Sequence, residues 1–574
     1  MCIRDRSGGS DHPIPDLPRN ARGPGAYVLQ YLFWSPFRET RMTRTRKAAL
    51  ASIVLVPLLA SGFALQARST RGGAQLLDQV LTFVALRYVD TLDAQQLYEK
   101  AARGLVNELK DPYTELFTPK QLEEFSRNTN GRYAGIGMEI VKVGDYVTVN
   151  KVFPGSPAEQ GGVLEGDKIA VVDTTSARGF NTQQVQNKLL GPIGTPVTVQ
   201  FLRVGVAQPV KLSFKRAEIH VPAVRYSMML DERTGYIPLE RFSEQTTEDI
   251  ANAVMALSKR GAKGFIIDLR GNPGGILEEA FSMSNLFLPR GKELLSVRGR
   301  GEFQKFVSQQ DPLAPDVPLT VLVDGGSASA SEIVAGALQD YDRALVLGTT
   351  SFGKGLVQSV YNLDGGYALK ITTGKWYTPS GRSIQKERKL NADGQFLEVQ
   401  PDSMETDSVR KARPVYKSAA GRTVYGGGAI TPDIIVQPDT LSTAEQALRR
   451  ALLPHYAKYQ AHAAAVAELQ KGKVKPDFAV DPAWREEVYR RLQADTVKIE
   501  KAVWDAGASD IDRFLEDRVA KIAFGDTLVR RRNLKDDNQL RRAMEIMRKG
   551  TTQKDLFTVA ASEPASKPGV ARRN

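Results

Sequence analysis

The sequence predicts a layered α/β domain that carries a β-rich module and has helical regions at both ends. Between about residues 217 and 438, short apolar runs of strand type alternate with helical patterns, which is typical of helices layered on a sheet. Between about 131 and 216 the strand-type runs are short and separated by glycine and proline, which is typical of a compact β-rich module. Apolar residues recur every three or four positions from 76 to about 126, and the charged stretch from 442 to 549 also has a helical pattern.

Three strands and two helices define the α/β region. The runs Gly264–Leu269, Leu319–Val323 and Ala344–Leu347 are apolar without alternation, as expected of buried strands. Helical patterns near Ile276–Phe287 and Ser331–Gln339 follow the first two of these strands. The chain therefore passes repeatedly from a strand to a helix and back.

The regions on the N-terminal side of this core have weaker patterns. Tyr146–Val149 and Val197–Leu202 are the clearest strands of the β-rich module, and turns are expected at Pro154–Pro157 and Gly191-Pro192. The preceding helical region should break at Asp111-Pro112, because proline ends a helix at or near the residue before it.

The length of 574 residues exceeds what one core usually holds, and at about 150 residues per domain it predicts three or four folded units. A content of 42% hydrophobic and 25% charged residues is typical of folded protein. The predicted segments are an unstructured or spurious N-terminal extension (1–41), a signal sequence or membrane anchor (42–70), a helical region (71–128), the β-rich module (129–216), the α/β core (217–438), a basic helical region (439–549) and a disordered tail (550–574).

The residue inventory excludes several chemistries. The net charge of +13 fits nucleic acid, an anionic membrane or a plain basic surface, and we favour the last, with no nucleic-acid partner. Cys2 is the only cysteine, so the folded body has no disulfide, thiolate zinc site or cysteine nucleophile. The four histidines, His12, His220, His455 and His462, form no HExxH pair, so we expect no metal and no cofactor.

A targeting segment is expected near the start of the chain. Met42 is followed by the basic stretch Thr43–Lys47 and then by an uncharged run, Ala48–Ala67. A basic flank before an apolar run is typical of a secretory signal, and the run is also long enough for a membrane anchor. A buried core helix is the alternative, but no polar face accompanies the run. We expect an envelope protein, either periplasmic or anchored to the inner membrane with its folded domains outside the cytoplasm.

Two turns at strand ends are candidates for chemistry. The first, Asp268–Gly275, contains the glycines of Asn272-Pro273-Gly274-Gly275 and can leave backbone N–H groups exposed to an anion or oxyanion, although such a turn is as often plain punctuation. The second, Asp324–Ile333, places three serines at a helix start. One serine there can cap the helix, but three caps are not needed, and a free hydroxyl on a tight turn can be a nucleophile.

The third candidate, Gly348–Gly355, spells GxxxxGK, which almost matches a phosphate-binding loop. Gly355 stands where that loop needs Ser or Thr, and the following Leu356–Val360 is of strand type, so no helix N-terminus awaits a phosphate. A lysine among glycines and aliphatic residues is poorly hydrated, which lowers its pKa toward values at which Lys354 can accept a serine proton. A histidine base would have to be His220, which more simply has a structural role.

At these residues the sequence resembles the carboxyl-terminal processing peptidases, also called tail-specific proteases, over roughly 76 to 438. The stretch Ser327-Ala328-Ser329-Ala330-Ser331-Glu332-Ile333 and the motif Phe352-Gly353-Lys354-Gly355 carry the resemblance. It implies a serine endopeptidase with Ser329 as nucleophile, Lys354 as base and Gln358 as the residue that orients the base. It also implies a crotonase-like or ClpP-like layered α/β peptidase core with an inserted PDZ domain.

The same resemblance implies further site residues. The oxyanion hole should combine the amide of Ala330 with that of Gly274 or Gly275, between which the sequence does not choose. The stretch Gly135-Ile136-Gly137-Met138 stands where PDZ domains have their carboxylate-binding loop. The implied partners are polypeptides with apolar C-terminal tails, which PDZ domains bind as an added strand. The membrane, reached through the apolar N-terminal segment, and a second copy of the chain are further candidate partners.

Two other functions compete with the peptidase hypothesis. A non-catalytic PDZ scaffold of the envelope would hold partners without cutting them, but it has no need for Ser, Lys and Gln together in these glycine contexts. A P-loop enzyme would bind a nucleotide through Lys354, but the mismatches at and after Gly355 argue against this hypothesis.

Overall fold

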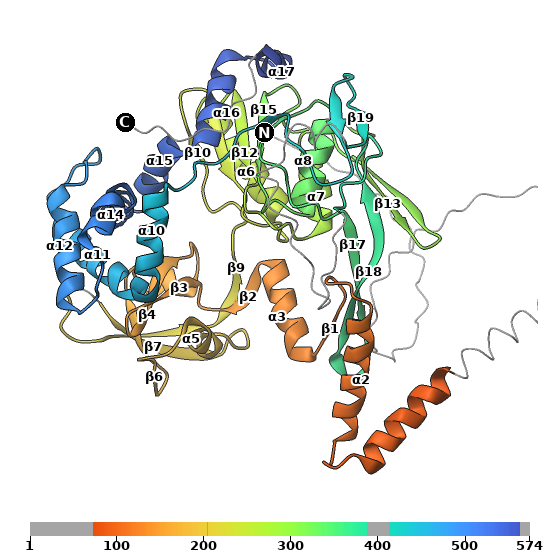
Figure 1. Ribbon diagram of the computed structural model, residues 1–574, viewed down its shortest axis with the longest axis horizontal. Coiled ribbons are helices and arrows are strands. Elements are labelled where there is room, and N and C mark those ends of the chain that lie inside the picture. The colour runs from red at the N-terminus through yellow and green to blue at the C-terminus, as the bar shows by residue number, and fades with distance from the viewer. Residues whose placement is uncertain (1–72, 204, 387–412, 563–574) are drawn as a thin grey trace, which may run out of the picture. The chain divides into compact units, whose positions relative to one another are not determined.

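The computed structural model describes residues 73–203, 205–386 and 413–562 (Figure 1). The predicted N-terminal extension (1–41) and targeting segment (42–70) lie outside the described residues. Packing divides the chain into two units, Met1–Tyr98 and Glu99–Asn574. The described part of the first unit is a helix over 73–87 and the start of α2 (Ala94–Glu108). Among the described residues, no helix has the length and apolar character needed to cross a membrane.

The α/β core in the second unit is built on a six-stranded sheet. Its strands, in spatial order, are β10 (Met228–Met229), β11 (Thr234–Pro238), β12 (Gly264–Asp268), β15 (Leu319–Val323), β16 (Leu345–Gly348) and β21 (Ile434–Ile435). Neighbouring strands from β11 to β21 are parallel, and the edge strand β10 is antiparallel to β11. β12, β15 and β16 are buried along their whole length, as their uninterrupted apolar sequences predict.

Helices cover both faces of this sheet. They are α6 (Thr246–Lys259), α7 (Leu277–Asn285) and α8 (Ala330–Asp340), and on the other face α16 (Asn538–Lys549) and α17 (Gln553–Ser562). Successive strand residues point to opposite faces, so Ile267 and Val321 pack in the core of the first three helices. Their neighbours Ile266 and Leu322 pack against α16 and α17. The result is a three-layered α/β/α core whose strand ends carry the candidate loops.

The end of the chain departs from the prediction. A disordered tail was expected over 550–574, but α17 folds within it. Leu556 of α17 is completely buried in the core between the sheet and α16, which also contains Met547. Tertiary packing therefore orders a helix that is too short to show a clear helical period in its sequence. Residues 563–574 lie outside the described residues.

A separate helical group precedes α16. Its helices are α10 (Thr443–Leu452), α11 (Tyr456–Gln470), α12 (Pro482–Ala494), α13 (Lys501–Ala506), α14 (Ala508–Phe524) and α15 (Asp526–Asp536). The first five of these, α10 to α14, share a core in which Trp504, Leu448 and Ile511 are completely buried. Leu534 of α15 packs instead against the core under α16 and α17. This group therefore has a hydrophobic core of its own, distinct from those on the two faces of the sheet.

A second sheet lies beside the candidate loops. Its strands are β1 (Glu115–Phe117), β13 (Glu293–Gly299), β14 (Phe303–Val307), β17 (Leu356–Asn362) and β18 (Ala368–Tyr377), and a hairpin of β19 (Val415–Lys417) and β20 (Thr423–Tyr425) stands apart. β1 lies between α2 and α3 (Pro119–Asn130), within the region predicted to be helical, and pairs with β18. Three residues are too few to show a strand period in the sequence.

The β-rich module has its own sheet, in the order β3-β4-β5-β7-β8 with β6 paired to β5. Its elements are β3 (Met138–Val143), β4 (Tyr146–Val152), α4 (Pro157–Gln160), β5 (Lys168–Val172), β6 (Thr175–Ser176), α5 (Thr182–Leu189), β7 (Pro196–Leu202) and β8 (Val210–Lys215). Val147, Val199 and Phe201 are completely buried at its centre. β2 (Arg132–Gly135) and β9 (Ala217–His220) pair where the chain enters and leaves the module. β3 is an edge strand, so one of its sides is open to an added strand.

Candidate active site

The three serines of the second loop have different surroundings. The Ser327 hydroxyl donates to the Leu269 carbonyl over 2.8 Å, and the Ser331 hydroxyl donates to the Asn272 carbonyl over 3.0 Å. Both side chains are completely buried. Ser329 is partly exposed and has φ of 54° and ψ of −113°, an uncommon conformation for a residue other than glycine. The structure thus separates Ser329 from two serines that serve the fold.

The glycine turn lies directly against Ser329. A Cβ on Gly274 would lie 2.8 Å from the Ser329 Cβ and 2.9 Å from the Ala330 nitrogen. A Cβ on Gly275 would lie 1.9 Å from the Phe242 carbonyl oxygen. Both glycines also have positive φ, +92° and +151°. A side chain is therefore excluded at both positions, and the backbone of the turn approaches the start of α8.

Hydrogen bonding distinguishes the two glycines. The Gly274 N–H donates to the Asn272 side-chain oxygen over 2.9 Å, whereas the N–H groups of Gly275 and Ala330 donate to no other group among the described residues. Asn272 is completely buried and also accepts the Ala328 N–H at its carbonyl over 3.0 Å. Asn272 therefore fixes the glycine turn to the serine loop and leaves two backbone donors available.

Glu332 connects the serine loop to the lysine loop. One of its carboxylate oxygens accepts the N–H groups of both Ser329 and Lys354, each over 2.9 Å. The other accepts the Gly353 N–H over 2.7 Å and the hydroxyl of Ser351. The side chain is completely buried, and this burial raises the pKa of Glu332 despite the hydrogen bonds that oppose the shift. Glu332 lies within the stretch that carries the family resemblance, but its sequence position predicts no role for it beyond that of a first-turn acidic residue.

The Lys354 ammonium lies 4.8 Å from the centre of the Tyr113 ring. Burial opposes the ionisation of Asp111, but hydrogen bonds from Thr114 and Thr372 and the charge of Lys354 hold its pKa below the usual value. In the sequence, Asp111-Pro112 predicted only a helix break. Tyr113, the aromatic residue that follows, was the missed signal of a contact with Lys354.

Gln358 lies on β17, opposite Thr372 of β18 and beside a β-bulge at Val357. Its side-chain nitrogen is buried and has no hydrogen-bond partner among the described residues. An unsatisfied buried amide costs about 1–3 kcal/mol, so its retention here invites a functional explanation. The loop containing Lys354 leads into this strand and not into a helix, which removes the P-loop hypothesis.

The predicted carboxylate-binding loop connects β2 to β3. The side chains of Ile136 and Met138 are buried in the core of the module, so they are not positioned to contact a ligand. The carbonyl of Ile136 accepts the Ala158 N–H over 2.8 Å, and that of Gly137 accepts the Phe153 N–H over 3.0 Å. Gly137 has φ of +87°, and a Cβ there would lie 2.2 Å from the Ser156 Cβ. Any ligand contact from this loop must come from its backbone.

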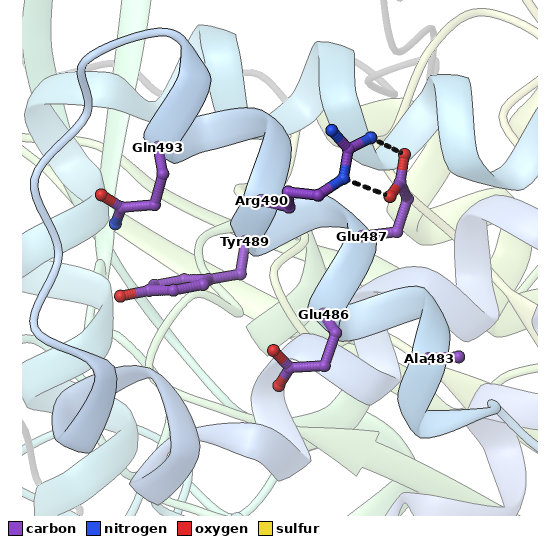
Figure 2. Close-up of a pocket in the computed structure, with 6 residues that line it drawn as sticks. All are labelled: Ala483, Glu486, Glu487, Tyr489, Arg490 and Gln493. Carbon is purple, nitrogen blue, oxygen red and sulfur yellow. Dashed lines mark hydrogen bonds and ion pairs between the residues drawn. The ribbon is translucent and has the colours of Figure 1, made fainter.

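A hollow elsewhere on the surface has no comparable chemistry. Figure 2 shows it along α12, where Arg490 pairs with Glu487 over 2.7 Å and Tyr489 lies nearby. The residues that line it include neither serine nor lysine. Among the described residues, no group of three His, Cys, Asp or Glu side chains could hold a metal ion.

Comparison with known proteins defines the class. Residues 233–403 match the model of peptidase family S41, and residues 125–202 match that of the PDZ domain. The carboxy-terminal-processing protease of Bartonella bacilliformis is 38% identical over 308 residues, which are 53% of this chain and 70% of that protein. The chain is thus a serine peptidase by class, with a PDZ domain. It belongs to peptidase family S41.

A second relative supports this assignment. The carboxy-terminal processing protease CtpA of Bacillus subtilis is 36% identical over 300 residues, covering 52% of this chain and 64% of that protein. The chain therefore spans about two thirds of the length of these relatives. Among solved structures, the photosystem II D1 C-terminal processing protease is 30% identical with a TM-score of 0.32, and the match covers 53% of this chain and 82% of that one. The predicted family and fold class are confirmed, and the roles of individual site residues stay predictions.

Proposed function

We propose that this chain is an exported serine endopeptidase that cuts polypeptides near their C-terminal tails, with Ser329 as nucleophile and Lys354 as general base. The observation that carries the proposal is the shared Glu332 oxygen, to which Ser329 and Lys354 both donate their backbone N–H groups over 2.9 Å. Through this shared oxygen, the backbone of a partly exposed serine lies close to the backbone of a lysine. A serine and a lysine suffice for acyl transfer, because the lysine alone can act as the base.

The reaction would begin with attack of the Ser329 hydroxyl on a peptide carbonyl, while neutral Lys354 takes the proton. The N–H groups of Gly275 and Ala330 would stabilise the negative charge that develops on the carbonyl oxygen. The proton passes from Lys354 to the leaving amine, and water then releases the acyl group from Ser329. Lys354 has a flexible stem, and its side-chain nitrogen, once neutral, would leave the Tyr113 ring to reach Ser329, with Gln358 orienting it.

The PDZ domain would select the substrate. A C-terminal tail would extend the sheet at the open edge of β3, with its carboxylate at the backbone of Gly135–Met138. Apolar tail residues would fill side-chain pockets of the module. In this scheme the nucleophile, the base and the oxyanion donors all come from the protein. The proposed reaction therefore uses no cofactor, metal or nucleic acid.

Localisation in the cell envelope is part of the proposal. It is supported by the basic stretch and apolar run that follow Met42 in the sequence. Fractionation of cells that produce the full chain, with mass spectrometry of its N-terminus, would separate a cleaved signal from an anchor. Recovery of the uncleaved chain in the cytosol would contradict export.

The activity is tested by incubating the purified chain with a protein that carries an apolar C-terminal tail. Wild type should release fragments whose masses locate cuts near the tail, and Ser329→Ala should release none while binding the tail equally well. Ser258→Ala, which changes an exposed serine on α6, is the matched control and should cut normally. Tail binding without cutting by wild type would favour the scaffold, and cutting by Ser329→Ala at the wild-type rate would refute the nucleophile.

A further inference from the structure

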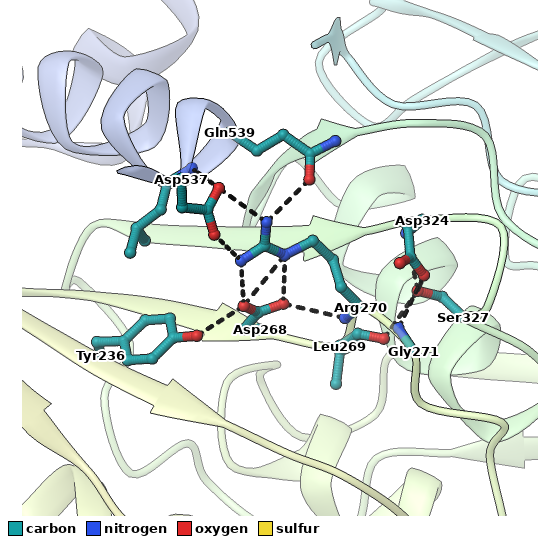
Figure 3. Close-up of polar contacts among 10 residues, drawn as sticks. Tyr236, Asp268, Leu269, Arg270, Gly271, Asp324, Ser327, Asp537 and Gln539 are labelled. Atoms are coloured by element: carbon teal, nitrogen blue, oxygen red, sulfur yellow. Dashed lines mark hydrogen bonds and ion pairs between the residues drawn. The ribbon is translucent and has the colours of Figure 1, made fainter. Parts of the chain in front are cut away.

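An arginine beside the glycine turn is held by a residue from far along the chain. Arg270 lies between β12 and the turn, and its guanidinium contacts two carboxylates, those of Asp268 and Asp537 (Figure 3). One terminal nitrogen donates to both carboxylates over 2.6 Å. The other donates to Asp537 over 3.0 Å and to the Gln539 side chain over 2.9 Å. Asp537 thus engages Arg270 in the paired geometry that makes such contacts strong.

Asp537 belongs to the C-terminal layer of the core. It is the N-cap of α16, where its side chain accepts the Leu540 N–H over 2.9 Å. α16 packs on the sheet through completely buried residues, Ala543 and Ile546 among them. The position of Asp537 is therefore set by the packing of α16 and not by its own side chain. It offers Arg270 a fixed counter-charge.

From Arg270 the contacts lead to the proposed oxyanion donors. The Gly271 N–H donates to Asp324 over 2.8 Å, and Asp324 accepts the Gly326 N–H over 2.9 Å at the same oxygen. The next residue, Asn272, holds Gly274 and Ala328 as described above. The turn is thus joined to the serine loop through Asp324 and Asn272, and Arg270 joins it to Asp537 of the C-terminal layer.

We propose that Asp537 is a positioning residue for the peptidase reaction. By holding Arg270, it keeps the turn from Gly271 to Gly275 against Ser329 and Ala330, so that α16 serves turnover as well as folding. This inference rests on the proposed function. Because an oxyanion forms only as the reaction proceeds, loosening the turn should lower kcat and leave KM almost unchanged.

Two substitutions separate this role from helix capping. Asp537→Ser keeps an efficient N-cap but is too short to reach Arg270, whereas Asp537→Asn keeps the cap and one hydrogen bond without the charge. We expect kcat to fall about tenfold in Asp537→Ser, since small displacements of catalytic groups cost up to about a hundredfold. Asp537→Asn should lie between Asp537→Ser and wild type.

The matched control is Arg548→Gln. Arg548 pairs with Asp231 over 3.1 Å and joins the far end of the same helix to the turn before β11, away from the glycine turn. This variant should lose a similar or smaller amount of stability and keep the wild-type kcat. Equal kcat values in wild type, Asp537→Ser and Arg548→Gln would overturn the proposal.

A second measurement does not depend on activity. Hydrogen–deuterium exchange of a peptide spanning the Gly271–Gly275 turn should be several times faster in Asp537→Ser than in wild type or Arg548→Gln, while peptides from α16 exchange alike. Unchanged exchange in the turn would overturn the proposal even if wild type cuts no substrate. Cutting by wild type that stops in Ser329→Ala, with unchanged kcat in Asp537→Ser, would leave the proposed function standing and remove only this inference.

Discussion

Gly274 faces Ser329 so closely that a Cβ on Gly274 would lie 2.8 Å from the Ser329 Cβ. The same Cβ would lie 2.7 Å from the Ala328 carbonyl oxygen, which belongs to the backbone and cannot rotate away. The glycine turn and the serine loop are therefore packed backbone against backbone, and a substitution here tests whether that contact serves catalysis.

Gly274→Ala should lower kcat/KM at least about a hundredfold, because the turn must move away from Ser329 and carry the oxyanion donors with it. The control is Gly291→Ala, which has a similar φ of +82° but open space around the new methyl group. It shares the cost of a positive φ, about 1–3 kcal/mol, without the clash. Peptide cleavage and thermal unfolding measured on both variants separate the effect on catalysis from the effect on stability. Similar kcat/KM in the two would contradict the role of the contact.

Glu332→Gln should lower both activity and stability. The amide can accept hydrogen bonds only at its oxygen, so some of the donors from Ser329, Gly353 and Lys354 would be stranded, at about 1–3 kcal/mol each. We expect kcat/KM to fall at least about tenfold because the serine and lysine loops separate.

A largely buried carboxylate that contacts the C-terminal end of α8 provides the comparison for this variant. The side chain of Asp433 is only 8% exposed, and burial is the chief cause of its raised pKa. It accepts hydrogen bonds from Gln339 and the Val346 N–H and pairs with Arg422. Asp433→Asn should lose comparable stability in denaturant unfolding but keep its kcat/KM. Equal losses of kcat/KM in both variants would mean that Glu332 acts only through stability.

Gln358→Met tests the orienting residue. Methionine fills nearly the same volume, and the Gln358 nitrogen has no hydrogen-bond partner among the described residues, so the substitution should leave stability unchanged or slightly higher. If Gln358 orients Lys354 during the reaction, kcat should still fall about tenfold. Thermal unfolding and initial rates measured together separate the two effects. An unchanged kcat would remove Gln358 from the mechanism.

Tyr113→Leu should shift the rise of activity with pH toward lower pH. The aromatic face favours the charged ammonium of Lys354, which lies 4.8 Å from the ring centre, and a lysine must be neutral to act as a base. Tyr113→Phe keeps the ring face and should keep the wild-type pH profile of kcat/KM. Asp111 faces the same ammonium and is unchanged in both variants. Coincident pH profiles for Tyr113→Leu and Tyr113→Phe would show that the aromatic ring does not stabilise the charged form of Lys354.

The sequence predicted the layered core because β12, β15 and β16 are uninterrupted apolar runs, and it placed the candidate loops because each follows one of these strands. It could not separate Ser329 from Ser327 and Ser331 without the family resemblance, since all three can cap a helix. It missed Glu332, which looks like any first-turn acidic residue until the lysine loop folds onto it. The contact of Arg270 with Asp537 spans 267 positions, and no local pattern records such a pair.

Acid should destabilise the helical group of α10 to α15 through Glu445. Burial raises its pKa, but hydrogen bonds from the Ser442 N–H, Arg513 and Ser509 outweigh it and lower the pKa from 4.5 to about 2. The folded state therefore favours the carboxylate. Its contribution to stability is complete above about pH 4.5 and is lost as the pH falls toward 2.

Glu445→Gln removes this dependence, so the variant should be less stable than wild type at pH 7 and the difference should shrink as the pH falls below about 4.5. Urea unfolding at pH 7 and at lower pH, followed by tryptophan fluorescence, measures both effects because Trp504 is completely buried in this group. Glu486→Gln is the control, since Glu486 pairs with Lys501 at an exposed site where ion pairs contribute little. A constant gap between wild type and Glu445→Gln at all pH values would show that the hydrogen bonds around Glu445 do not depend on its charge.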